Sequence, residues 1–465
     1  MFDVMSMIGL KKDTKTISDT EIVELLKVNP SLLEQFEKEY WKHDGVRDGI
    51  FGVNAKHMAT DVNITDVSIV DRIVNELLDQ TYRYRYDGKN SSVEKLSVDI
   101  KEYVTLDEVN SIDKSVRPQI TGKYMPKDIH DDAYKTILWM YKKWKETGNK
   151  EFYGRFRNGL DTLDLDGIMY EMLGLYDTSM GNWLPALVDG VSKQDFFKVP
   201  ATTIIRVPLP ILQLTRMEFE EINNTTKLIV DRFCQKAFNL DKNKDYFIKT
   251  GVFSSKFDFR NAKVTDENEV MEIGQYLLFI NHQAQMLGCS LFSGIGFYGA
   301  NTTNEWVVRE FIRDKEKAEE IYHGLPLHVE YRVFVDFDTR EVLAVAPYWE
   351  ENTMKSHFKG RQDIDAKHDM ITYSLWLDKN KHRFTENKEL VRNKVEMMLG
   401  DINLSGQWSM DIMQNGNDFY IIDMATADVS ALNNYIPEGK LKAHKENWVL
   451  GERLSLSDRE DKVDG

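Results

Sequence analysis

Two aspartates stand at apolar positions of a β-hairpin that the sequence predicts over residues 408–428. The turn of this hairpin is the segment Asn415–Asp418, which contains Asn-Gly between two apolar runs, the strongest short-range hairpin signal. Asp411 falls on the first strand and Asp423 on the second. Because a charge in a buried strand is costly unless it is paired or holds a metal, these facing carboxylates predict a hard-cation site, such as one for Mg²⁺ that bridges phosphates. A solvated hairpin edge explains the two aspartates equally well when they are considered alone.

A lysine also interrupts an apolar strand. Lys249 lies in the strand predicted over residues 245–250 and is followed by a loop, Gly251–Lys256, which contains two serines. An ammonium group beside a loop of backbone N–H donors suits a phosphate group, although a hairpin with a snorkelling lysine is the more ordinary explanation of this segment. The P-loop motif GxxxxGK[ST] is absent from the segment.

Two arginines interrupt later strands. Arg309 lies within residues 306–312 and Arg332 within residues 329–335. Glu330 shares a strand face with Arg332, so an internal ion pair explains that strand alone; otherwise a half-buried guanidinium requires a bidentate anion. Three cations and two carboxylates at strand positions of one region together predict a site for a nucleoside triphosphate with Mg²⁺.

The elements that must position these residues follow two patterns along the chain. Residues 1–195 read mainly as helices, beginning with a capping-box pattern at Ser18–Glu21 and with an amphipathic stripe from Val67 to Leu78. From residue 196 to residue 450, predicted strands alternate with helices, and residues 451–465 form a charged tail. This order predicts an α+β fold in which antiparallel hairpins pack against helices.

Composition narrows the classes of partner. A chain of 465 residues is expected to hold two or three domains, and its formal charge of −16 argues against a nucleic-acid partner. No run approaches the ~18 apolar residues that favour a membrane span, so no membrane partner is expected. Two cysteines, Cys234 and Cys289, favour a reducing compartment, and a cytoplasmic location is therefore expected.

The order of these features resembles the ATP-grasp superfamily. The features that carry the resemblance are a strand lysine, a flexible loop, a long helix, the run Val307–Ile312, the Glu-x-Arg strand and the hairpin with two carboxylates. More narrowly, the chain is similar to the clade marked by two arginines and one lysine. That clade includes eukaryotic proteins that assemble a translation initiation factor, and bacterial and phage proteins proposed as peptide ligases. The closest segments are residues 247–258 and 330–335, and the resemblance covers about residues 200–435.

The resemblance implies an ATP-grasp domain over residues 196–450, after a helical region of unknown role over residues 1–195. It also implies ATP and Mg²⁺ as cofactors. The implied nucleotide-binding residues are Lys249, Gly251, Ser254, Ser255, Arg309, Glu310, Phe311, Glu330 and Arg332, and the implied metal ligands are Asp411 and Asp423.

The resemblance also implies a role for these residues in binding or catalysis. Lys249 contacts the phosphates and Arg332 neutralises the transferring phosphoryl group, so these two cations are the implied catalytic residues. Backbone groups of residues 309–311 meet the adenine edge, and Glu330 reaches the ribose or a metal. The sequence departs from the superfamily at Ala425, where a further metal-binding asparagine is usual, and Asp428 is the candidate substitute.

Three functions are compatible with these residues and with the resemblance. The first is an ATP-dependent carboxylate–amine ligase that forms an acyl phosphate on a carboxylate-bearing substrate, such as a peptide or protein. The second is an ATP-binding assembly factor whose output is binding to a protein partner. The third is a nucleotidyltransferase, because Lys42-His-Asp-Gly45 matches the KxDG motif of adenylating ligases, although the other motifs of those enzymes are poor here. The donor and acceptor substrates and the oligomeric state are left open.

Overall fold

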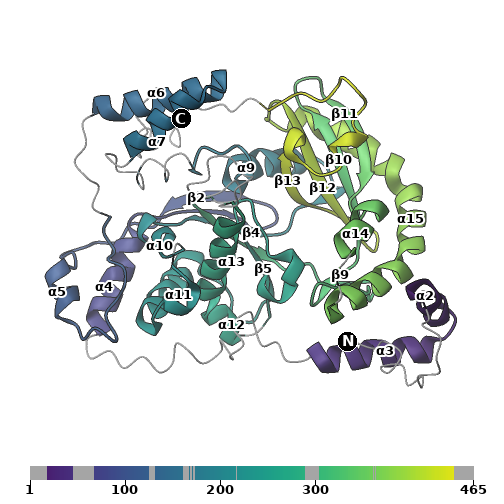
Figure 1. Cartoon of the computed structure of the whole chain (residues 1–465), viewed down its shortest axis with the longest axis horizontal. Coiled ribbons are helices and arrows are strands. Elements are labelled where there is room, and N and C mark those ends of the chain that lie inside the picture. Colours follow the sequence, from purple (N-terminus) through teal and green to yellow (C-terminus); the bar gives the residue numbers. More distant parts are fainter. Residues whose placement is uncertain are drawn as a thin grey trace.

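A six-stranded antiparallel sheet and a five-stranded, mostly antiparallel sheet, each covered by helices, form the body of the molecule (Figure 1). The computed structural model describes residues 18–44, 67–124, 131–160, 173–215, 217–265, 267–288, 303–359 and 363–444, together with residues 167, 170 and 361. The α+β class predicted from the sequence is confirmed. Among the described residues, no helix combines the length and the apolar character that crossing a membrane requires.

The first sheet has six strands in the order β2-β1-β4-β7-β5-β6, and every neighbouring pair is antiparallel. Its strands are β1 (Tyr82–Tyr86), β2 (Ser91–Lys95), β4 (Thr202–Arg206), β5 (Tyr246–Thr250), β6 (Lys263–Val264) and β7 (Glu305–Glu310). Four helices share a buried apolar core with it: α4 (Val67–Leu78), α10 (Leu209–Leu214), α11 (Asn224–Phe238) and α13 (Ile273–Gly288). This sheet carries Lys249 on β5 and Arg309 on β7.

The hairpin of β1 and β2 lies within the region that was predicted as mainly helical. Residues 87–90 form the turn of this hairpin, and Ser91 begins β2. The sequence Tyr82-Arg-Tyr-Arg-Tyr86 alternates with period two, which is the strand signal that the sequence analysis missed. Because β1 pairs with β4, part of residues 1–195 belongs to the same sheet as residues 202–310.

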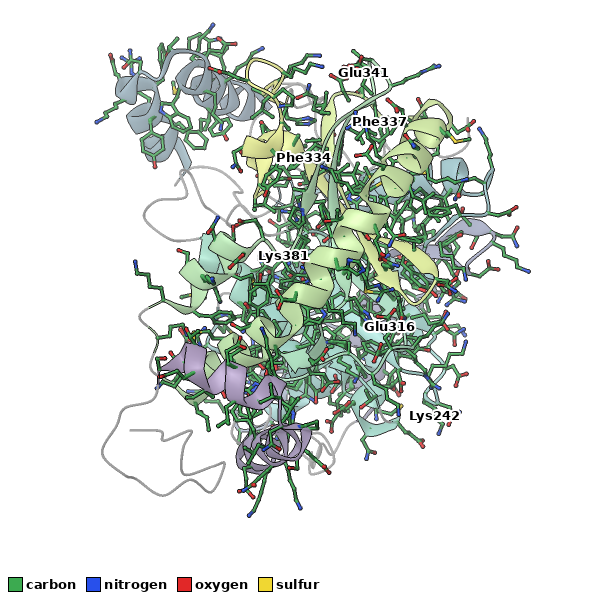
Figure 2. All side chains as sticks on the ribbon, turned by 90° about the vertical axis from the view of Figure 1, so that its right-hand side faces the viewer. Lys242, Glu316, Phe334, Phe337, Glu341 and Lys381 are labelled. Carbon is green, nitrogen blue, oxygen red and sulfur yellow. The ribbon has the colours of Figure 1, made fainter. Side chains whose placement is uncertain are left out.

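The second sheet has five strands in the order β11-β10-β12-β13-β3. Its strands are β3 (Phe197–Lys198), β10 (Val329–Asp336), β11 (Glu341–Pro347), β12 (Gln407–Asn415) and β13 (Asp418–Thr426). All pairs are antiparallel except β13 with β3, which is parallel. The core on one face comes from α9 (Met180–Val191) and the long α15 (Ile364–Met398), which crosses the front of the sheet in Figure 2.

The predicted C-terminal hairpin is confirmed. Strands β12 and β13 are joined at Gly416 and Asn417, and Gly416 has φ +64°, a conformation that the turn requires and that glycine adopts without strain. Asp411 and Asp423 are partners in the register of the two strands, beside a β-bulge that separates Asp411 from Ile412. The hairpin therefore sets the two carboxylates next to each other on one face.

The remaining elements are shorter or lie at the periphery. The helices are α2 (Asp19–Lys27), α3 (Pro30–Asp44), α5 (Leu106–Ser111), α6 (Asp131–Thr147), α7 (Lys150–Leu160), α12 (Glu267–Met271) and α14 (Glu351–Phe358). The short strands are β8 (Glu320–Ile321) and β9 (Leu325–Pro326), and the 3-10 helices are η2 (Phe219–Glu221), η3 (Lys256–Asn261), η4 (Leu399–Asp401), η5 (Ala427–Val429) and η6 (Asn433–Tyr435). The predicted capping box at Ser18 and Glu21 is present at the start of α2, and the predicted tail lies outside the described residues.

A buried histidine on α15 contacts α3 and so stabilises the packing of the helix pair α2–α3 against α15. His368 is 1% exposed, its ring stacks on Tyr40 at 3.5 Å, and its two nitrogens lie 3.1 Å from Glu37 Oε2 and 3.1 Å from Asp369 Oδ1. Burial favours the neutral ring, but the hydrogen bonds to Asp369 and Glu37 outweigh it and raise the pKa of His368 above its ordinary value. The imidazolium therefore contributes to the docking of α3.

We expect this docking to weaken as the pH rises. A folded-state pKa above the unfolded value of about 6.5 gives stabilisation that is complete below about pH 6.5 and is lost as the pH passes through the raised pKa. Amide exchange of α2 and α3, corrected for its intrinsic pH dependence, should therefore show more protection at about pH 6 than at about pH 9. The substitution His368→Gln should remove that difference, and an equal difference in the variant would contradict the assignment.

Candidate functional site

The cavity between the two sheets gathers most of the residues that the sequence analysis singled out. It has a volume of about 140 Å³, and we call it the nucleotide cavity after the role that the resemblance implies for its residues. The predicted residues that line it are Lys249, Ser254, Arg309, Glu310, Phe311, Glu330, Asp411 and Asp423. Its further lining includes Lys256, His328, Tyr348, Trp349 and Ile422. Gly251, Ser255 and Arg332 do not line it.

Arg332 pairs with Asp411 across the neighbouring strand. The two residues are register partners on β10 and β12, and Arg332 Nε and Nη2 donate to Asp411 Oδ1 and Oδ2 at 2.8 Å and 2.7 Å. Their side chains are 12% and 9% exposed. The Arg332 guanidinium also lies 4.6 Å from the ring centre of Tyr348. The alternative of an ion pair between Arg332 and Glu330 is therefore wrong, because the bidentate partner is Asp411.

Lys249 pairs with the second aspartate and connects the two sheets. Its Nζ donates to Asp423 Oδ2 at 2.8 Å. The lysine side chain is 2% exposed and the aspartate side chain 37% exposed, so the ammonium is buried while the carboxylate keeps access to water. A snorkelling lysine does not describe this geometry. Asp411 thus pairs with a cation from its own sheet, and Asp423 pairs with a cation from the other sheet.

Glu330 and Lys256 are two further charges in the cavity. Glu330 Oε1 accepts a hydrogen bond from Trp349 Nε1 at 3.2 Å, and burial raises the pKa of Glu330 to about 7. Lys256 Nζ lies 4.3 Å from the ring centre of Tyr348, and burial lowers the pKa of Lys256. A carboxylic acid that titrates near neutrality inside a cavity is a common property of functional sites.

Arg309 joins the two sheets through its side chain. Its Nε donates to Thr202 Oγ1 at 3.2 Å, and its Nη1 donates to the carbonyl of Ile422 on β13. Burial lowers the pKa of Arg309 to about 10, and Nη2 is a buried donor without a partner in the described part of the chain. Arg309 therefore contributes a guanidinium to the cavity, while its backbone lies within the sheet between β4 and β5.

The run Val307–Ile312, which we call the hinge, and the loop after Lys249 both differ from what the resemblance implied. The N–H groups of Glu310 and Phe311 donate to the carbonyls of Ala201 and Asp245, at 2.8 Å and 3.0 Å. These two N–H groups therefore already have acceptors and are not free donors for the adenine contact that the resemblance implied.

The loop after Lys249 contributes only part of its length to the cavity. The Cα of Gly251 faces Ser179, Thr303 and Glu305, with no room for a Cβ. Ser255 is buried and accepts a hydrogen bond from Asn261. Ser254 and Lys256 are the loop residues that line the cavity.

Asp428 does not take the place of the metal-binding asparagine that is usual at the position of Ala425. Asp428 lies in η5, outside the lining of the cavity, and its Oδ2 accepts the N–H of His444 at 2.8 Å. Among the described residues, no group of three or more histidine, cysteine, aspartate or glutamate side chains could hold a metal ion. A divalent cation at Asp411 and Asp423 would therefore have two protein carboxylates from the hairpin, with its other ligands from water or phosphate, which is the usual arrangement for Mg²⁺.

Lys256, His328 and Trp349 are cavity residues that the sequence analysis did not assign. Lys256 belonged to the recognised loop, but its role depended on how η3 turns the side chain inward. His328 directly precedes β10, and burial lowers the pKa of its ring. Lys256 and His328 are close in sequence to Lys249 and Glu330, whereas Trp349 follows β11 and meets Glu330 only through the fold.

Lys42, the candidate for covalent adenylylation, does not belong to this site. Its side chain is 74% exposed near the end of α3, with Glu39 at 3.9 Å, and it does not line the nucleotide cavity. Gly45 of the motif lies outside the described residues.

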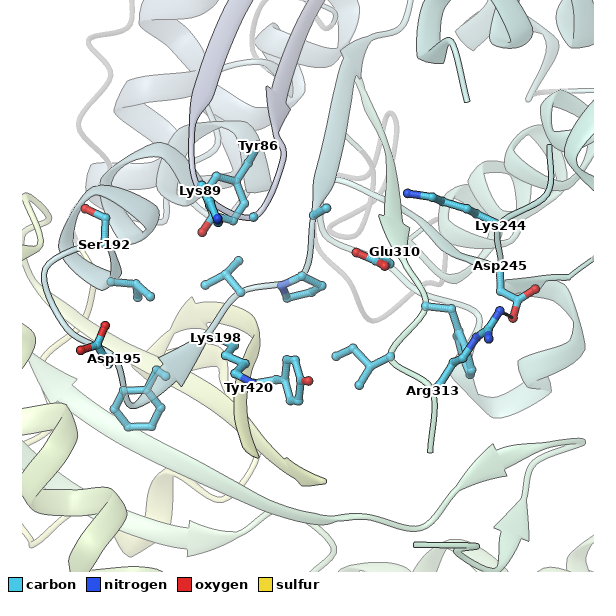
Figure 3. A pocket seen from close by; sticks show the side chains of 18 of the residues that line it. Tyr86, Lys89, Ser192, Asp195, Lys198, Lys244, Asp245, Glu310, Arg313 and Tyr420 are labelled. Carbon is cyan, nitrogen blue, oxygen red and sulfur yellow. Dashed lines mark ion pairs between the residues drawn. The ribbon is translucent and has the colours of Figure 1, made fainter. Parts of the chain in front are cut away.

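A larger cleft of about 840 Å³ lies against the other side of the hinge (Figure 3). It shares Pro200, Glu310, Phe311 and Ile312 with the nucleotide cavity, and we call it the hinge cleft. Its remaining lining is Tyr86, Gly88, Lys89, Val191, Ser192, Gln194, Asp195, Phe197, Lys198, Val199, Ala201, Lys244, Asp245, Arg313, Lys315 and Tyr420.

Comparison with known proteins gives distant matches. No family model and no curated protein matches the sequence. Two solved structures are similar, Cdc123 from Schizosaccharomyces pombe and its C-terminally truncated form, each with 11% sequence identity. The matches cover 54% and 55% of this chain, and 84% and 86% of those chains, with TM-scores of 0.33 and 0.31. Similarity at this level does not establish a shared fold or function.

Proposed function

We propose that the chain binds ATP with Mg²⁺ in the nucleotide cavity and passes the effect of that binding to a protein partner, as an assembly factor does. The observation that carries the proposal is the pair of salt bridges at the hairpin, Lys249–Asp423 and Arg332–Asp411. Two cations and two carboxylates meet where the two sheets face each other. This is the set of charges that a nucleoside triphosphate with a divalent cation needs.

Nucleotide binding requires these pairs to exchange partners. With nucleotide bound, Lys249 and Arg332 would turn from the aspartates to the phosphate oxygens, and Asp411 and Asp423 would hold the metal. When it is bound, Mg²⁺ supplies positive charge that neutralises the phosphates. The cavity of about 140 Å³ is smaller than the roughly 300–1,000 Å³ of typical ligand pockets, so the sheets or the loop after Lys249 also have to open.

The metal ligands favour binding over rapid turnover. Ala425 provides no side-chain ligand, and the carboxylate of Asp428 is engaged by His444 outside the cavity lining. A cation held by only two protein carboxylates is sufficient for nucleotide binding. Transfer of a phosphoryl group requires precise alignment, which depends on the geometry of all the metal ligands. A missing metal ligand therefore lowers the rate of transfer more than it lowers the affinity for nucleotide.

A ligase of ATP-grasp type is the second candidate, and Glu330 is the observation that favours it. A buried carboxylic acid with a pKa of about 7, next to the phosphate-binding cations, suits proton transfer at an amine acceptor. The guanidinium of Arg332 would neutralise charge that develops when a carboxylate attacks the γ-phosphorus and ADP leaves. The group that accepts the phosphoryl would then be a carboxylate of a peptide or protein.

Release of ADP separates the two candidates. With saturating MgATP and mixtures of amines and carboxylic acids, we expect ADP release to stay at the background rate. Release that requires both an amine and a carboxylic acid would establish the ligase instead. In that case Arg332→Lys should lower the rate by roughly 10²–10³, because the planar guanidinium is lost while the charge is kept.

A further inference from the structure

The hinge cleft is bordered by two of the chain segments that pass between the two sheets. Residues 199–201 connect β3 of the five-stranded sheet with β4 of the six-stranded sheet, and residues 311–315 leave β7 towards the five-stranded sheet. Tyr420 on β13 and Tyr86 on β1 bring side chains from each sheet into the same cleft (Figure 3). A ligand in the hinge cleft therefore contacts both sheets.

The cleft is positive although the chain is strongly negative. It is lined by five lysines or arginines and three carboxylates, in a chain with a formal charge of −16. Lys198 and Lys315 both pair with Asp418, and Arg313 pairs with Asp245 at 3.4 Å. Three cations thus share two carboxylates, which leaves an excess of positive charge.

Two lysines on opposite sides of the cleft add to this charge. Lys89, in the turn between β1 and β2, and Lys244, just before β5, are both exposed, and neither has an ion-pair partner in the described part of the chain. Figure 3 shows their side chains on separate walls, so they do not converge on one point as they would around a single phosphate. The spacing suits a ligand that carries several separated negative charges.

The remaining lining indicates which kind of anion fits. Asp195 and Glu310 also face the cleft, and their charge would repel the continuous phosphates of a nucleic acid. The partly exposed aromatic rings of Phe311 and Tyr420 offer contact to apolar side chains. A volume of about 840 Å³ lies in the upper part of the range for ligand pockets, roughly 300–1,000 Å³.

We propose that the hinge cleft is a second binding site, which takes an acidic polypeptide segment of a protein partner. The segment places carboxylates near Lys89 and Lys244 and apolar side chains against the aromatic rings. Because it contacts both sheets beside the hinge, its binding fixes their relative position. This inference does not rest on nucleotide binding.

The test uses the full chain without nucleotide. A fluorescein-labelled peptide of alternating glutamate and tyrosine is titrated with the protein, and its fluorescence anisotropy is measured. The variant Lys89→Glu/Lys244→Glu reverses two exposed charges of the cleft, and we expect it to weaken binding about tenfold or more, which is about 1.4 kcal/mol or more. The matched control is Lys101→Glu/Lys114→Glu, which reverses two exposed lysines outside the cleft and changes the net charge equally.

Each outcome supports or overturns the inference. Saturable binding to the wild type that falls only in the cleft variant supports it. The inference is overturned if the acidic peptide does not bind, if both double variants weaken it equally, or if an alternating lysine–tyrosine peptide binds as well. Affinity for MgATP, measured on the same variants, should be unchanged, so a failure of nucleotide binding would leave the peptide result to stand by itself.

Discussion

Replacing Asp411 by asparagine should lower the free energy of unfolding by about 3–5 kcal/mol, because it leaves the Arg332 guanidinium buried without its counter-charge. The pair has two hydrogen bonds of 2.8 Å and 2.7 Å, and neither side chain is more than 12% exposed. Denaturant unfolding of the wild type and the variant measures the difference.

The same hairpin provides a matched control. Asp418 begins β13 and pairs with Lys198 and Lys315, whose side chains are 49% and 52% exposed. The substitution Asp418→Asn should cost at most about 1 kcal/mol, as exposed ion pairs usually do. An equal loss of stability in Asp411→Asn and Asp418→Asn would contradict the importance of the buried pair.

A double substitution separates the structural role of this pair from its role in the site. In Arg332→Met/Asp411→Leu both charges are removed together, and apolar replacement of a buried pair is often neutral or stabilising. We expect this variant to recover most of the stability and to fail to bind MgATP. Binding as tight as that of the wild type would exclude both residues from the nucleotide site.

Lys249→Met should leave the fold intact and weaken the binding of MgATP by about 10–150-fold. A hydrogen bond to a charged group contributes about 1.5–3 kcal/mol, which corresponds to that range of affinity. The methionine fills nearly the same volume, and Asp423 keeps contact with water because its side chain is 37% exposed. Calorimetric titration with MgATP and denaturant unfolding measure the two effects.

The control for this variant is Lys242→Met, which removes a lysine close to β5 in sequence. Lys242 lies at the periphery of the molecule in Figure 2, and its side chain is 54% exposed. It lines neither the nucleotide cavity nor the hinge cleft. Its substitution should leave the affinity unchanged, and a similar loss in both variants would indicate a general effect of charge.

Local sequence was sufficient for the elements that carry the site. Asn-Gly between two apolar runs predicted the hairpin of β12 and β13, because two-residue turns with glycine at positive φ match the twist of the strands. Charged residues at apolar strand positions identified Lys249, Arg332, Asp411 and Asp423, since burial of each requires a partner. The choice of residues therefore followed from patterns of a few neighbouring positions.

The partners of these charges depend on pairing between distant segments. Arg332 meets Asp411 because of the register of β10 against β12, and Lys249 meets Asp423 across the two sheets, 174 residues later in the chain. A short sequence window contains neither relation. The hairpin of β1 and β2 was missed for a different reason: alternation of tyrosine with arginine is a strand pattern in which both residue types are partly polar.

Calorimetric titration of the wild-type chain with ATP, in the presence and absence of Mg²⁺, tests most directly whether the cavity between the sheets is a nucleotide site. The account predicts saturable binding at a single site, with affinity at least about tenfold higher when Mg²⁺ is present, since two carboxylates would otherwise face the phosphates. Bound nucleotide should also raise the free energy of unfolding, by about 2.7 kcal/mol at a hundred times the Kd. Absence of saturable binding, or binding of equal strength without Mg²⁺, would contradict it.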